Sequence, residues 1–112
     1  MRTLLIFSLL VVGLAVSSQA QTAQVTLATS AQCGMCKSRL ERDMLFTPGV
    51  KKVVLDLETK GLTVWYNAGK VDLEGLRKAV NRIGYDADAS PADPAAYEKL
   101  PACCKKGGMD HE

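Results

Sequence analysis

The sequence predicts an α+β protein of the ferredoxin-like class, with a four-stranded antiparallel sheet and two helices on one face. Three observations predict this fold: short runs in which apolar residues alternate, two segments with apolar residues at helical spacing, and the order of these segments. The order is β-α-β-β-α-β, which makes two split βαβ units. A length of 112 residues suits one such domain.

The first half of the domain is expected to begin with a strand and a helix. Residues 24–28 alternate apolar with polar or small side chains, which predicts a strand. Residues 34–45 place Cys36, Leu40 and Met44 at helical spacing, with charged residues between them. A Thr-Pro-Gly turn ends the predicted helix.

The second half is expected to contain a hairpin, a helix and a last strand. Two alternating runs, 53–58 and 62–66, flank a Thr-Lys-Gly turn and predict the hairpin. Asp72 is placed to cap a helix with one apolar stripe, and Gly84 is placed to end it. Residues 85–89 alternate weakly and predict a short strand at the edge of the sheet.

The N-terminus has the pattern of a secretory signal peptide. One basic residue, Arg2, precedes an apolar run that ends in small and polar residues at Ala20. The run is shorter than the roughly 20 residues that span a bilayer as a helix. We therefore expect residues 1–20 to be cleaved, leaving a periplasmic or secreted protein that is not inserted in a membrane.

The composition divides the rest of the chain into a domain, residues 21–89, and a C-terminal extension, residues 90–112. The extension contains a predicted short helix from Ala95 to Leu100, with Asp93 as its cap and proline in its first turn. From Ala102 onward there is no apolar periodicity. We expect this last part to be mobile unless something such as a bound metal fixes it.

Charge and residue content exclude several classes of function. The formal net charge is +2, and the basic residues are scattered and not interleaved with aromatic ones, so no nucleic-acid partner is expected. The chain has one histidine and no glycine-rich phosphate loop after a strand, and its carboxylates have no enclosed site to occupy. We expect a protein that is not an enzyme.

The chemically informative motif is Cys33-Gly34-Met35-Cys36, where the first strand meets the first helix. Amide hydrogens and the dipole at the start of a helix stabilise a thiolate, which is the form that binds metal. The spacing lets both sulfurs reach one ion at about 2.3 Å. Thiolates in low number favour soft ions, copper(I) first among them.

Two other uses of this motif stay open at the sequence level. A Cys-x-x-Cys pair between a strand and a helix also suits a thiol-disulfide oxidoreductase. An oxidising compartment also favours disulfides, so the chain could be a disulfide-bonded interaction module. A four-residue loop closed by a bridge removes little chain entropy, which argues against a purely stabilising link between Cys33 and Cys36.

Several separated motifs follow the pattern of one known family: Thr29–Cys36, Pro48–Val50, Leu55–Thr59 and Ile83–Asp86. From Gln24 to Ala89 the chain resembles the heavy-metal-associated domain, a family of copper chaperones, metal-binding domains of transport ATPases and periplasmic mercury-binding proteins. The resemblance implies the ferredoxin-like fold, metal held by Cys33 and Cys36, and transfer by exchange of thiolate ligands. It also implies that Tyr85 shields the metal.

The chain departs from the family just before the first cysteine. Members carry Gly-Met and one further residue there, whereas this chain has Ser30-Ala31-Gln32. The methionine packs under the loop in the family, so alanine predicts a looser or differently seated loop. The chain's own methionine, Met35, is expected to point to solvent in a docking surface, or else to bring its thioether to the metal.

The extension adds a second pair of thiols, Cys103 and Cys104, as secondary candidate ligands. Adjacent cysteines rarely bridge each other because the ring is strained. The tail could fold back to add thiolates to the first pair, or form a separate soft site with Met109 and His111. Disulfides to Cys33 or Cys36, or between chains, are the third alternative.

The sequence thus predicts an exported protein that binds one soft metal ion and transfers or sequesters it. Copper(I) is the first expectation, with mercury(II) or zinc(II) as alternatives. A metal-transporting membrane protein is the expected partner. The oxidoreductase and the disulfide-bonded module remain the competing hypotheses.

Overall fold

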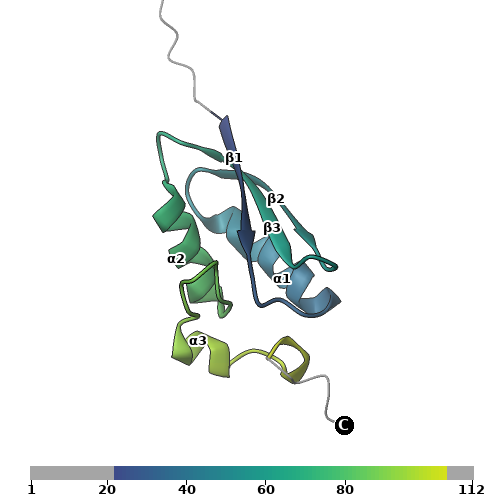
Figure 1. The fold of residues 1–112 in the computed structure, drawn as a ribbon. Helices are drawn as coiled ribbons and strands as arrows, with labels where there is room; N and C mark the ends of the chain where they lie inside the picture. The colour runs from purple at the N-terminus through teal and green to yellow at the C-terminus, as the bar shows by residue number, and fades with distance from the viewer. Residues whose placement is uncertain (1–21, 106–112) are drawn as a thin grey trace, which may run out of the picture.

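Three antiparallel strands form the sheet, in the order β1-β3-β2 (Figure 1). The structure is a computed structural model that describes residues 22–105. In it β1 spans Thr22–Ala28, β2 spans Val50–Asp56 and β3 spans Gly61–Asn67. Leu27 and Leu55 both lie opposite Leu62, and all three leucines are buried. This row of apolar side chains across the sheet confirms the predicted first strand and hairpin.

Two helices carry the apolar stripes that the sequence predicts. Helix α1 spans Gly34–Asp43 and continues as a 3-10 turn, η1, at Met44–Phe46, while α2 spans Leu73–Ile83. Helix α1 packs against β2 and α2, and Figure 1 shows it behind the sheet. Asp72 caps α2 by accepting a hydrogen bond from the Gly75 amide at 2.8 Å.

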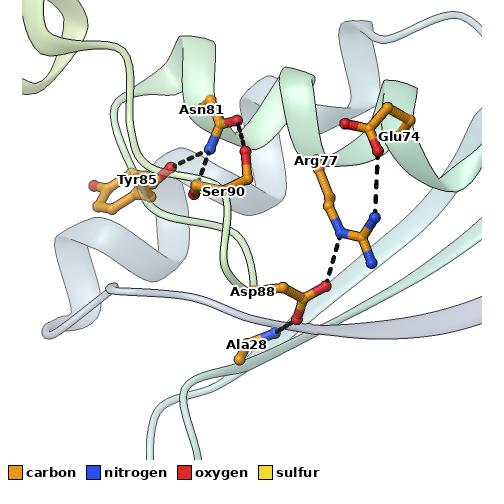
Figure 2. Close-up of polar contacts among 7 residues, drawn as sticks. All are labelled: Ala28, Glu74, Arg77, Asn81, Tyr85, Asp88 and Ser90. Atoms are coloured by element: carbon orange, nitrogen blue, oxygen red, sulfur yellow. Dashed lines mark hydrogen bonds and ion pairs between the residues drawn. The ribbon is translucent and has the colours of Figure 1, made fainter.

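The predicted fourth strand does not form within the described residues. Residues 85–89 make only single bridges, from Ala87 to Thr29 and to Ser90. Asp88 has a φ of 53°, a left-handed conformation that breaks an extended segment. Its carboxylate accepts hydrogen bonds from the Ala28 amide and from Arg77 Nε, both at 3.0 Å (Figure 2). Together with the Asp88 amide, which donates to the Ala28 carbonyl at 2.7 Å, these contacts fasten a turn to the end of β1. The described residues therefore form a three-stranded sheet, and the expected fourth strand is not formed at residues 85–89.

A second set of polar contacts attaches the same loop to α2. Asn81 Nδ2 donates to the carbonyls of Tyr85 and Ser90, each at 3.1 Å, and Ser90 Oγ donates back to Asn81 Oδ1 at 2.5 Å (Figure 2). One side chain therefore satisfies backbone groups at both ends of the loop. The result is a fixed loop that holds the Tyr85 side chain fully buried.

The Asp88 contacts predict an acid-sensitive contribution to stability. The Ala28 amide, followed by Arg77, holds the pKa of Asp88 below its usual value. A carboxyl with a depressed folded pKa stabilises the fold above its ordinary pKa of about 4 and loses that contribution as the pH falls through the folded value. In urea unfolding at a series of pH values, Asp88→Asn should therefore be less stable than the parent at pH 7, with the difference shrinking below pH 4. A difference that does not change with pH would contradict this account.

The extension is folded against the domain. Helix α3 spans Pro94–Glu98, with the Asp93 side chain accepting from the Ala96 amide at 3.1 Å, and a 3-10 turn, η2, spans Ala102–Cys104. The short helix and its cap agree with the sequence. The sequence predicts that this part is mobile unless something fixes it, and for residues 102–105 packing does so, because Cys104 is buried in the domain core.

Some predictions lie outside the described residues. They are the signal peptide at residues 1–20 and the tail residues Met109 and His111. Among the helices of residues 22–105, none combines the length and the apolar character that crossing a membrane requires.

Candidate metal centre

Cys33 and Cys36 lie at the start of α1, as the sequence predicts. Cys33 is the N-cap residue, with extended backbone angles, and Cys36 lies in the first turn of the helix. Their Sγ atoms are 3.4 Å apart. This is far beyond the bond length of a disulfide, about 2.05 Å, and within the roughly 4.6 Å that two sulfurs on one ion can span. The pair is therefore a dithiol with a geometry suited to one ion.

The loop before Cys33 is fixed at both ends. The amide and the hydroxyl of Thr29 both donate to the carbonyl of Lys60, at 3.0 and 2.9 Å. Ala31, which replaces the family's methionine, is fully buried in the core, and its amide donates to Thr29 Oγ1. The small residue is thus seated under the loop, and the looser or differently seated loop that alanine predicts stays a prediction.

The structure places the second pair of cysteines beside the first. Cys103 Sγ lies 3.0 Å and Cys104 Sγ lies 3.9 Å from Cys33 Sγ. The sulfurs of Cys33, Cys103 and Cys104 all lie within 4.8 Å of one another, and all four cysteines are free thiols. Of the three alternatives from the sequence, this arrangement is that of a tail folded back onto the first pair.

A contact that the sequence did not signal holds the end of the tail in this position. Gln32 Nε2 donates to the backbone carbonyl of Lys105 at 2.9 Å. The two residues are 73 positions apart. No local pattern marks a bond between a side-chain amide and a distant carbonyl, so only the folded chain reveals it.

Electrostatics separates the roles of the thiols. Burial alone raises the pKa of Cys33, but the neighbouring Cys103 thiol and the amides of Cys36 and Met35 outweigh it and lower this pKa to about 7. Burial raises the pKa of Cys104 to about 12, and the adjacent Cys36 adds to the shift. Cys33 thus becomes the nucleophilic, metal-binding thiolate near neutral pH, whereas Cys104 stays protonated there.

Two further side chains border the sulfurs. Met35 is 52% exposed, and its Sδ lies 3.9 Å from Cys103 Sγ, so it faces solvent at the edge of the cluster. Tyr85 is fully buried, and this burial, together with the nearby sulfurs of Cys104 and Cys36, raises its pKa well above the usual range. The phenol therefore stays protonated and covers the inner side of the cluster.

The family comparison agrees with this geometry. Residues 30–86 match the heavy-metal-associated domain, and this segment contains both Cys33 and Cys36. The chain belongs to the heavy-metal-associated domain family. The match ends before α3, so the extension with Cys103 and Cys104 lies outside the family segment.

This heavy-metal-associated domain protein is similar to one curated relative and two solved structures as follows. A copper-exporting P-type ATPase of Staphylococcus haemolyticus is 32% identical over 84 residues, which are 75% of this chain but only 10% of the relative. A CopZ metallochaperone structure is 30% identical, with a TM-score of 0.55, over 58% of this chain and 98% of its own. Oxidized MerP from Ralstonia metallidurans CH34 is 28% identical, with a TM-score of 0.58, over 61% of this chain and 96% of its own.

Proposed function

We propose that this chain is an exported metal-binding protein that holds one copper(I) ion between Cys33 and Cys36. The observation that carries the proposal is a free dithiol at the start of α1, with its sulfurs 3.4 Å apart and one thiol with a pKa of about 7. A thiolate at that position costs little to form, and two thiolates select a soft ion over hard ions such as magnesium or calcium.

The names of the similar proteins favour copper over other soft ions. The curated relatives at or above 30% identity include copper-exporting and copper-transporting ATPases, and one structural neighbour is a CopZ metallochaperone. The resemblance to periplasmic mercury-binding proteins makes mercury(II) a competing cargo, and the thiolate ligands make zinc(II) a further one. All three ions accept thiolate ligands, and direct competition between them ranks their affinities.

The protein either hands its ion to a metal-transporting membrane protein or sequesters it. Transfer would proceed by exchange of thiolate ligands, because an incoming thiolate can bind the ion before Cys33 or Cys36 leaves it. The basic start and short apolar run of residues 1–20 support export to the periplasm or out of the cell. In this role the chain binds and releases an ion and catalyses no reaction.

Substitution of the dithiol tests the proposal. The chain from Gln21 onward, reduced and titrated anaerobically with copper(I) against a chelator of known affinity, should bind one equivalent. Cys33→Ser combined with Cys36→Ser should abolish this binding, because one ion then loses both thiolates of the pair. Ser38→Ala changes an exposed residue of the same helix that carries no thiol, and this matched control should still bind one equivalent. Full binding by the double variant would refute the proposal.

The lowered pKa of Cys33 also suits a redox dithiol, and this property supports a second candidate function. A thiol-disulfide oxidoreductase reduces insulin with many turnovers when a dithiol reductant is supplied. The metal-binding proposal predicts no turnover above the reductant alone. Sustained turnover that Cys33→Ser abolishes would favour the enzyme.

A further inference from the structure

The two cysteines of the extension lie against the pair that the proposed function uses, and that function gives them no role. The sulfurs of Cys33, Cys103 and Cys104 form a group within 4.8 Å. Three sulfurs bonded to one ion in a plane at about 2.3 Å lie roughly 4.0 Å apart. The measured separations from Cys33, 3.0 and 3.9 Å, are within about 1 Å of that spacing. Small side-chain movements therefore bring the three sulfurs onto one ion.

We propose that the extension is a built-in cap on the metal site, in which Cys103 and Cys104 join Cys33 as a three-thiolate set for the soft ion. The proposal rests on the function proposed above. Cys33 belongs both to this set and to the pair with Cys36, so the ion can pass from one to the other while keeping its bond to Cys33. Cys103 and Cys104 each release a proton to solvent as they bind, and Cys36 takes one up as its bond to the ion breaks.

Contacts between protein groups attach the cap to the domain. Gly84 has a φ of 121° and no side chain, and the Leu100 side chain fills the space, lying 3.1 Å from where a Cβ would stand. Leu100 and Cys104 are both buried in the domain core, and the Gln32 side chain holds the carbonyl of Lys105. A preorganised set of ligands pays less ordering entropy on binding than a free tail would.

Exposure shows which side of the site the cap covers. Cys36 and Cys104 are buried, whereas Cys33 and Cys103 are partly exposed and Met35 is 52% exposed. An acceptor's thiolate can reach the ion only from the exposed side, and Cys103 stands there, 3.0 Å from Cys33. The cap therefore takes the place of an incoming ligand, and we expect it to slow release of the ion.

A buried hydroxyl also borders the sulfurs. The hydroxyl of Tyr85 lies beside the sulfurs of Cys36 and Cys104, but among residues 22–105 no hydrogen bond of ordinary geometry satisfies it. An unsatisfied buried hydroxyl is costly, and a thiolate is a better acceptor than a thiol.

The number of sulfur ligands tests the cap. X-ray absorption of the copper(I)-loaded chain should show about three sulfurs in the parent, and still three in Cys36→Ala, which leaves the three-thiolate set intact. Cys103→Ser combined with Cys104→Ala should show two. Bathocuproine disulfonate should remove copper from this double variant at least about tenfold faster, the scale of effect that loss of a supporting ligand contact has on metal affinity.

Single variants keep the test valid if the double variant folds poorly. Cys103 is partly exposed, so Cys103→Ser should fold normally and also release copper faster. Gln32→Ala removes no sulfur but frees the end of the tail, and should speed release while three sulfurs remain. Two sulfurs and equal release rates in the parent and Cys103→Ser would overturn the cap and leave the Cys33–Cys36 function standing. Copper binding that survives loss of Cys33 and Cys36 would overturn the function itself.

Discussion

Cys33→Ser is expected to weaken copper(I) binding more than any other single cysteine substitution. Cys33 Sγ lies 3.0 to 3.9 Å from the other three sulfurs. Cys33 therefore belongs both to the pair with Cys36 and to the three-thiolate set. Losing a residue that only orients a ligand costs about 10–100-fold in affinity, and losing a shared ligand should exceed that. Competition titrations of four single variants, one for each cysteine, measure the order directly.

The fold should not account for this loss. Cys33 is partly exposed at the start of α1, and serine is itself a favoured N-cap residue. Cys33→Ser should therefore unfold in urea at nearly the same midpoint as the parent. An affinity for copper(I) within tenfold of the parent, in a folded protein, would show that Cys33 is not the common ligand.

Cys33 and Cys104 should become reactive toward alkylating agents in two different ranges of pH. Cys33 has its pKa lowered from 9.0 to about 7, whereas burial raises that of Cys104 to about 12. In the metal-free, reduced chain, alkylation of Cys33 by iodoacetamide should rise with pH through a midpoint near 7. Cys104 should stay unreactive through pH 9. Peptide mass spectrometry after timed quenching assigns each site.

The same titration predicts how copper binding depends on pH. Protons compete for Cys33 below pH 7, so this thiol alone should reduce the apparent affinity by about tenfold for each pH unit below 7, and by little above it. Cys103→Ser should move the alkylation midpoint of Cys33 upward, because the Cys103 thiol helps to lower that pKa. A midpoint near 9 in the parent would contradict the electrostatic account of the site.

The sequence predicts the parts of this fold that depend on local patterns. The hairpin, α2 with Asp72 and Gly84 at its ends, and the dithiol at the start of α1 all follow from spacing and capping rules. The alternation in residues 85–89 predicts a strand by the same logic. It fails there because Asp88 has a left-handed conformation and its carboxylate bonds to Arg77 and to the Ala28 amide, and Ala28 lies 60 residues away in sequence.

The tail shows the same limit at the candidate site. The sequence identifies Cys103 and Cys104 as ligand types but leaves their position open between three alternatives. Their approach to Cys33 depends on Leu100 packing over Gly84 and on the bond from Gln32 to Lys105. Neither contact has a local signature, since each joins segments that meet only after the domain has folded.

Metal analysis of the protein, purified anaerobically from the cells that express it and then placed in competition with a chelator of known affinity, tests the central claim most directly. We expect one tightly held soft ion per chain, which is copper(I) in copper-replete cells. Cys33 and Cys36 should be protected from alkylation until the ion is removed. A protein whose Cys33 and Cys36 are quantitatively bridged, and which takes up no copper(I), mercury(II) or zinc(II) after reduction, would contradict it.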